Sequence, residues 1–358
     1  MTKQVRRGAG YERTVIDLLL AHGNLDRAGI ARLAGVSRPS AGEIVQRLTD
    51  AGFVVEAGED DRPRRGPNSV LYGVRPGVAQ VAGVELQPEV AWAEVADLDG
   101  TALGTARCAA LAGEAPEQLA ERVVAQAARN GAIDPRALTA VIVAAPGIVG
   151  PDGDMTYVEG HPAWNAGLRD RLEASLAVPV RLENDVKLTA VAEQRHGAAA
   201  GVDSFALLRL GETVSAAIVL DGRVVRGATG AAGEVGYQVS RGPASWLNAD
   251  VSATVNAGTA LTPLFPDAAA AMVSVCSVVD PELVVVSGPA VDPTGEVAGL
   301  LQEFVHATTP FRPRVTFSGL GTESGSPAAT GATTRALDEV RDQIYGIAPQ
   351  FHPATRPL

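Results

Sequence analysis

The sequence predicts a protein of the mixed α/β class with a helical N-terminal region. Apolar residues recur at helical spacing over the first 50 positions, and short apolar strands then alternate with amphipathic helices from residue 78 onward. The chain of 358 residues is long enough for two or three domains, and its 46% hydrophobic content is typical of a globular protein. We therefore expect two domains, at residues 1–76 and 77–358.

The net charge of −11 is unevenly distributed. Residues 1–78 contain 12 basic and 9 acidic residues, whereas residues 79–358 contain 18 basic and 32 acidic residues. This asymmetry favours a small region that faces nucleic acid, attached to an acidic body. No apolar run reaches the roughly 18 residues of a membrane span. The basic N-terminal segment lacks the unbroken apolar stretch of a secretory signal, and two cysteines are too few for a disulfide framework. We expect a cytoplasmic protein with no membrane partner.

The first 52 residues predict three helices. Residues 12–21 carry a broad apolar stripe, and a second helix follows Asp26, a favourable N-cap residue. Gly35 breaks that helix, and Ser37 caps a third helix that ends at residues 51–52. Two short helices joined by a turn that contains glycine are typical of a helix-turn-helix. Gly29 departs from the pattern, because glycine within a helix costs up to about 1 kcal/mol relative to alanine.

Two strands, at residues 53–56 and 70–74, complete a predicted winged helix-turn-helix that binds a double-stranded DNA operator. The side chains expected to reach base edges or phosphates lie on the third helix and in the loop between the strands, and they are Arg38, Ser40, Glu43, Gln46, Arg47, Arg62, Arg64 and Arg65. A small helical interaction module with a solvated charged loop is the alternative. The agreement of helix lengths, turn, caps and wing favours DNA binding.

The acidic remainder predicts an α/β domain, because apolar strands alternate with helices. Its predicted helices include residues 116–130 and one that starts at Asp185 and runs to His196. Its predicted strands lie at residues 78–85, 91–98, 101–110, 141–145, 180–183, 204–210, 215–220 and 283–287.

Residues 208–239 resemble the signature of the ROK family, which comprises repressors, open reading frames and sugar kinases. Residues 145–149, 183–185 and 284–289 extend this resemblance, and a winged helix-turn-helix before such a domain resembles the repressor branch. The resemblance implies a two-lobed, actin-like sugar-kinase architecture with a ligand in the cleft. It also implies a homodimer or homotetramer, and a C-terminal helix near residues 329–345 that returns to the first lobe.

The phosphate loops of the resembled kinases are altered in this sequence. The first family loop has an Asp followed by paired Gly and Thr, but Gln87 and Pro88 replace the Gly pair here. The second loop is Gly-rich in the family, whereas here Glu212 stands where phosphates would approach. We therefore predict a protein that is not an enzyme, uses no ATP and holds no cofactor.

The sugar side of the resembled site is partly retained. Asp185 matches the general base of the family, and Glu234 matches an acid that contacts the sugar. Asn184 could bind a hydroxyl group, and His161 lies on the predicted cleft loop, where one expected polar contact is missing or replaced. Helix N-capping is the alternative role for Asn184 and Asp185, and the two roles are compatible. These four residues are the candidate ligand-binding residues.

The zinc site of the resembled family is missing here. Tyr237 stands at the position of the histidine ligand, and residues 241–247 contain no cysteine, so we predict no bound metal. We expect Tyr237 and Trp246 to fill the vacated volume as core residues, and a place in the lining of a changed pocket is the alternative. Cys108 and Cys276 are expected to be small buried apolar residues.

These observations together predict a DNA-binding transcriptional regulator, in particular a repressor. Its catalytically inactive second domain is expected to dimerise and to sense a sugar or another small-molecule effector. Two alternatives stay open. One is a sugar kinase with an appended N-terminal domain, and the other is a ligand-independent regulator that uses its acidic domain only to assemble.

Overall fold

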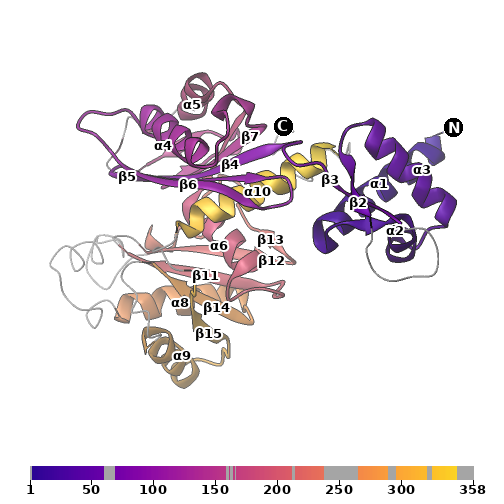
Figure 1. The fold of residues 1–358 in the computed structure, drawn as a ribbon. Coiled ribbons are helices and arrows are strands. Elements are labelled where there is room, and N and C mark those ends of the chain that lie inside the picture. The colour runs from indigo at the N-terminus through magenta and orange to yellow at the C-terminus, as the bar shows by residue number, and fades with distance from the viewer. Residues whose placement is uncertain are drawn as a thin grey trace.

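The computed structural model describes residues 2–59, 69–158, 161, 164–165, 167–211, 214–237, 265–288, 296–320 and 325–344. The chain forms a helical N-terminal region that lies beside two stacked α/β lobes (Figure 1). No helix within these described ranges is both long and apolar enough to cross a membrane.

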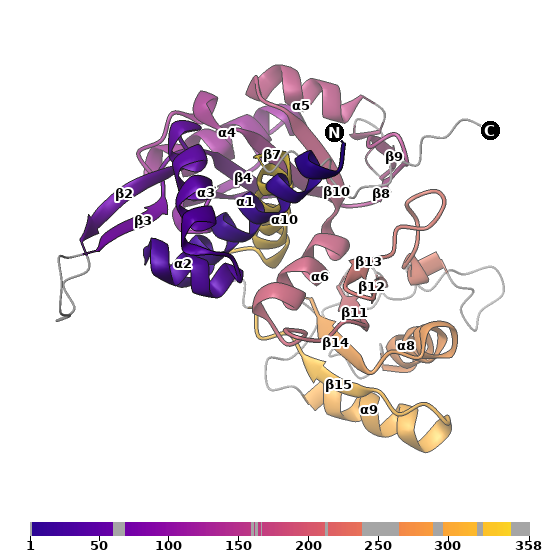
Figure 2. The ribbon, with the colours of Figure 1, turned by 90° about the vertical axis from the view of Figure 1, so that its right-hand side faces the viewer.

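The N-terminal region packs three helices against a small antiparallel sheet with the strand order β1-β3-β2. Its elements are α1 (Thr2–His22), β1 (Leu25–Asp26), α2 (Arg27–Ala34), α3 (Arg38–Asp50), β2 (Val54–Glu59) and β3 (Val70–Val74). Its core consists of apolar side chains from all three helices and the sheet, including Val15, Ile30, Ile44 and Tyr72. The strands β2 and β3 extend away from the rest of the molecule (Figure 2).

The predicted caps of the two short helices are confirmed. The side chain of Asp26 accepts a hydrogen bond of 2.7 Å from the backbone N–H of Gly29, and Ser37 accepts one of 3.2 Å from Ser40. Gly35 ends α2 in the left-handed conformation, with φ of 66°. Interpreting Gly29 only as a flaw was wrong, because a Cβ atom there would lie 2.9 Å from the capping oxygen of Asp26. Glycine thus leaves room for the cap.

The first lobe is built on a five-stranded sheet with the order β10-β7-β4-β5-β6. The strands β10, β7 and β4 run parallel, and β5 and β6 continue the sheet as an antiparallel pair. The elements of this lobe are β4 (Gln80–Leu86), β5 (Val90–Asp97), β6 (Ala102–Ala109), α4 (Pro116–Asn130), η1 (Pro135–Ala137), β7 (Ala140–Ala145), β8 (Ile148–Val149), β9 (Met155–Tyr157), α5 (Leu168–Leu176) and β10 (Val180–Asn184).

The second lobe repeats this layout with a sheet in the order β13-β12-β11-β14-β15. The strands β11, β14 and β15 run parallel, while β12 pairs antiparallel with both β11 and β13. The remaining elements are α6 (Asp185–His196), β11 (Phe205–Leu210), β12 (Val214–Leu220), β13 (Arg223–Val224), η3 (Val235–Tyr237), α8 (Phe265–Val279), β14 (Leu283–Ser287), α9 (Glu296–Thr308), β15 (Arg314–Phe317) and α10 (Pro327–Ile344).

The two sheets and their helices form five layers (Figure 1). The helices α4 and α5 cover the outer face of the first sheet, and α8 and α9 cover the outer face of the second. Between the sheets, α10 packs on the first and α6 on the second, and the two helices contact each other closely. A Cβ atom on Gly331 of α10 would lie 1.8 Å from the carbonyl oxygen of Leu188 of α6, so this crossing requires glycine.

The two cysteines differ in burial. Cys276, on α8, lies in the core of the second lobe, as expected, and burial raises the pKa of its thiol to about 11. Cys108 lies on the edge strand β6 and is only half-buried, so the prediction of a buried residue was wrong for this position.

Candidate nucleic-acid interface and interlobe site

The helix α3 has a buried face and an open face. Ala41, Ile44, Val45 and Leu48 pack into the core of the N-terminal region, at the spacing that the sequence predicted. On the other side, Arg38, Glu43 and Gln46 are exposed and Ser40 is half-buried. The open face therefore carries four of the side chains predicted to contact DNA.

Two of the predicted contact residues are held by neighbours on the protein. The Nε of Arg47 donates a hydrogen bond of 2.7 Å to Glu12 of α1, and the Nε2 of Gln46 donates one of 2.8 Å to Asp50. In the described part of the chain, Arg38 has no hydrogen-bond or ion-pair partner. The predicted contact residues Arg62, Arg64 and Arg65 lie outside the described residues.

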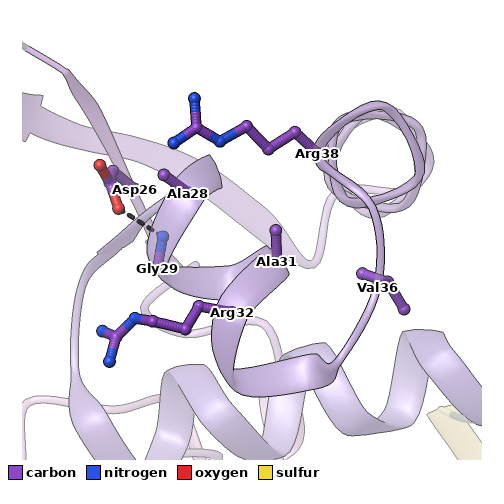
Figure 3. Close-up of a pocket in the computed structure, with 7 residues that line it drawn as sticks. All are labelled: Asp26, Ala28, Gly29, Ala31, Arg32, Val36 and Arg38. Carbon is purple, nitrogen blue, oxygen red and sulfur yellow. Dashed lines mark hydrogen bonds between the residues drawn. The ribbon is translucent and has the colours of Figure 1, made fainter.

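An open depression of about 400 Å³ lies between α2 and the start of α3. Figure 3 shows that the side chains of Arg32 and Arg38 extend in the same direction, one from α2 and the other from α3. The one carboxylate in its lining, Asp26, accepts the capping hydrogen bond of α2 from the backbone N–H of Gly29 at its Oδ1. The full lining is Asp26, Ala28, Gly29, Ala31, Arg32, Val36 and Arg38. Two exposed guanidinium groups beside a concave surface suit a backbone phosphate.

Arg32 was not among the residues predicted to contact DNA. The DNA contacts predicted from the sequence lie on the third helix and in the wing, whereas Arg32 lies on the exposed side of the second helix. Its helical spacing from the buried pair Ile30 and Ala31 was the signal that could have indicated its outward position.

The second candidate site lies where β4 ends and α6 begins, between the two lobes. The Nε2 of Gln87 donates hydrogen bonds of 3.0 Å to Glu85 and 3.0 Å to Asp185. The other carboxylate oxygen of Glu85 accepts a hydrogen bond from Ser326, which precedes α10. Burial raises the pKa of Glu85, while the Ser326 hydrogen bond opposes the shift and the nearby Asp185 adds to it.

Asn184 and Asp185 have different roles at the start of α6. The side chain of Asn184 accepts a hydrogen bond of 3.0 Å from the backbone N–H of Lys187, which confirms the capping role, and donates one of 2.9 Å to the carbonyl of Gly147. One carboxylate oxygen of Asp185 accepts the hydrogen bond from the amide of Gln87, and the other accepts one from the backbone N–H of Val186. Both side chains are about 95% buried.

Buried charges surround the first turn of α6. Lys187 is almost fully buried, and its ammonium group donates a hydrogen bond to the carbonyl of Gly230. Burial lowers the pKa of Lys187, and the nearby Glu183 and Glu234 oppose that shift. Burial also raises the pKa of Glu234 to about 6, with Lys187 opposing and Asp185 adding to the shift. Glu183 is paired with Arg226 at 2.6 Å. The structure thus brings Asn184, Asp185 and Glu234 together.

The aromatic residues of this region lie nearer the surface. His161 is exposed and its ring meets that of Trp164 edge-on, with a centroid distance of 6.3 Å. Tyr237 is 36% exposed and meets Tyr157 edge-on at 6.3 Å, so the prediction that Tyr237 fills the core was wrong. Trp246 and residues 241–247 lie outside the described residues. Within the described ranges, no group of three or more His, Cys, Asp or Glu side chains could hold a metal ion.

Residues 81–244 match the model of the ROK family. The xylose repressor of Caldicellulosiruptor bescii is 23% identical over 227 residues, which are 62% of this chain and 57% of the repressor. A beta-glucoside kinase of Listeria monocytogenes is 33% identical over 111 residues, which are 30% of this chain and 38% of the kinase. The chain thus spans little more than half of the repressor and a smaller share of the kinase.

Two solved structures share the fold. A ROK family transcriptional regulator, a homologue of the Escherichia coli MLC protein, superposes with a TM-score of 0.70 and 18% identity over 95% of this chain and 98% of the regulator. A ROK hexokinase from Thermus thermophilus superposes with a TM-score of 0.57 and 25% identity over 72% of this chain and 99% of the hexokinase. The likeness to both establishes the two-lobed, actin-like architecture that the resemblance to the ROK family implied.

Proposed function

Residues 81–244 belong to a ROK family domain, and on this premise we propose that the chain is a DNA-binding transcriptional regulator that acts as a repressor. Residues 1–76 bind the DNA, and residues 77–358 form the domain that assembles the protein and senses a small molecule. The observation that carries the proposal is the open face of α3 on a capped helix-turn-helix, joined to a domain that is similar to that of a xylose repressor.

The DNA contacts divide into two groups. Arg38, Ser40, Glu43 and Gln46 face the base edges of the major groove from α3. Arg32 and Arg38 border the depression beside α2, where a backbone phosphate fits. Arg47 makes a smaller contribution, because its side chain is already paired with Glu12. Arg62, Arg64 and Arg65 add contacts from the wing.

The ROK family domain does not phosphorylate sugars. A general base at Asp185 needs a carboxylate that is free to take the proton of a sugar hydroxyl, yet the amide of Gln87 is bonded to one of its oxygens. The same Gln87 stands where the resembled kinases have glycine, so its side chain takes up room beside the phosphate path. This arrangement supports a binding role for Asn184, Asp185 and Glu234, with His161 at the margin of the site.

Kinase activity remains the competing function, because sequence relatives include sugar kinases and Asp185 is present. Incubation of the full chain with ATP and a panel of hexoses separates the two. We expect no formation of ADP above the rate without sugar. Turnover that depends on a sugar and is lost in Asp185→Asn would overturn the regulatory proposal in favour of a kinase.

DNA binding is tested by electrophoretic mobility shift on the region upstream of the gene for this protein. We expect a complex that survives excess unrelated DNA, with two half-sites one or more helical turns apart if the protein is a dimer. The sensing role is tested by thermal shift with sugars and other metabolites, because a ligand that binds the folded state raises Tm. Should no compound in a broad panel raise Tm, the ligand-independent regulator is the better description.

A further inference from the structure

Gly42 lies inside the helix α3, where glycine is less favourable than alanine. The fold does not need glycine at this position, because a Cβ atom there would meet no heavy atom of the described residues within 4 Å. At Gly29 and Gly331 the situation differs, since a Cβ atom would collide with Asp26 or with the backbone of Leu188. No contact within the described part of the protein therefore accounts for the glycine at position 42.

Gly42 lies between two of the predicted DNA contacts on α3. Arg38 precedes it by four residues and Gln46 follows it by four, so the three residues are neighbours on one side of the helix. Arg38 and Gln46 are exposed and Gly42 is half-buried, whereas the adjacent Ala41 is fully buried in the core. A partner that meets α3 between Arg38 and Gln46 therefore touches main chain rather than a side chain.

We propose that Gly42 is the point of closest approach between α3 and DNA, where the base edges pack directly against the helix backbone. This inference rests on the proposed function. The major groove of B-DNA is about 12 Å wide, and an α-helix with its side chains is about 10–12 Å across, so the fit is tight. Removing one side chain from the inserted face lets the helix lie deeper in the groove. Arg38 and Gln46 then reach bases on either side of the gap.

A second helical glycine serves as the matched control. Gly299 of α9 is exposed, and a Cβ atom there also meets no heavy atom of the described residues within 4 Å. It lies in the outer layer of the second lobe, on a helix separate from the helix-turn-helix (Figure 1). Alanine at either position therefore has the same local effect on its helix, and only position 42 faces the proposed DNA.

The experiment compares the full-length wild type with Gly42→Ala, Gly42→Leu and Gly299→Ala. The probe is a 30-base-pair duplex that the wild type selects from a random pool, and binding is measured by fluorescence anisotropy at one fixed salt concentration. We expect Gly42→Ala to weaken binding by about tenfold or more, and Gly42→Leu to weaken it further. Gly299→Ala should leave Kd within about twofold of the wild type. Thermal unfolding should show unchanged or higher Tm for both alanine variants, because alanine favours helix.

The outcomes separate this inference from the proposed function. If the wild type selects a duplex and Gly42→Ala and Gly42→Leu bind it as tightly, the close approach at Gly42 is wrong while DNA binding stands. If the wild type selects no duplex, the proposed function fails and this inference fails with it. Loss of binding in Gly299→Ala as well would mean that helix stiffening, and not access to position 42, weakens the complex.

Discussion

Asp342 in the last turns of α10 forms an ion pair with Arg13 of α1, with 2.9 Å between the Oδ1 and Nη1 atoms. Two residues on, Ile344 packs against both the core of the N-terminal region and the core between the lobes. At the other end of α10, Ser326 bonds Glu85 in the interlobe site. One helix of 18 residues thus connects the interlobe site to the helix-turn-helix.

The contact of Ile344 should stabilise the N-terminal region and hold it in place. We expect Ile344→Ala to lower the free energy of unfolding by about 1–2 kcal/mol, less than a fully buried isoleucine, and also to weaken DNA binding. Urea unfolding and a DNA titration measure the two effects. Ile133→Ala is the matched control, because Ile133 is equally a partly buried residue but packs in the first lobe. If both variants alter DNA binding alike, α10 has no special part in positioning the helix-turn-helix.

Gln87 should stabilise the interlobe site by bonding two acids at once. Among the described contacts, Gln87 is the only amide that bonds both Glu85 and Asp185. Replacing it with Leu removes both hydrogen bonds and leaves the two carboxylates to repel each other. We expect Gln87→Leu to lower the free energy of unfolding at pH 7 by about 1–3 kcal/mol. Chemical denaturation measures this loss. Gln126→Leu is the comparison, since Gln126 bonds two neighbours at the surface, Asn130 through its amide nitrogen and Arg129 through its amide oxygen, and a comparable loss there would contradict the interpretation.

Glu234 should make stability depend on pH. Its pKa rises from 4.5 to about 6 on folding, so between these values the folded state binds more protons than the unfolded state. Stability from this group is therefore present at low pH and is lost as the pH rises through about 6. We expect Glu234→Gln to remove this loss. Between pH 4.5 and pH 7, the free energy of unfolding of the variant should therefore rise by up to about 2 kcal/mol relative to that of the wild type.

Unfolding of the wild type and Glu234→Gln at both pH values measures this difference. Glu89→Gln, which changes an exposed carboxylate, provides the baseline. A constant difference between wild type and Glu234→Gln across that range would show that Glu234 titrates at an ordinary value when folded.

Arg32 and Arg38 should contribute differently to DNA binding. Arg32→Ala is expected to weaken binding to all duplexes by a similar factor and to reduce the slope of log Kd against log salt by about one, because a phosphate contact carries no sequence information. Arg38→Ala should also reduce discrimination between duplexes. Titrations at several salt concentrations test both. Arg136→Ala, an exposed change in the first lobe, should leave the slope unchanged.

The local features of the N-terminal region could be predicted because they depend on neighbours in the sequence. The caps at Asp26 and Ser37 and the turn at Gly35 involve residues at most a few positions apart. The role of Gly29 was missed although its partner Asp26 is only three residues away, because helix propensity ignores the space that a capping side chain occupies. The buried face of α3 followed directly from apolar spacing.

The partners and the exposure of the predicted site residues could not be derived from their neighbours in the sequence. Arg47 and Gln46 have the same expected role from sequence, yet Arg47 is paired with Glu12, 35 positions earlier, and Gln46 with Asp50. Tyr237 was expected in a core, but the folding of the loop after β13 places its ring at the surface beside Tyr157. Side-chain partners of this kind depend on how separate elements meet.

We could predict from the sequence alone the alternation of helices and strands, the caps of the short helices and the residues that stand at the altered phosphate loop. Each of these follows from short-range spacing or from residue identity. The folded chain was needed to show that Gln87 reaches Asp185, 98 positions away, and that α10 ends against α1. The reason is physical: β4 and α6 meet because β4, β7 and β10 pair in one sheet, and no local pattern encodes that pairing.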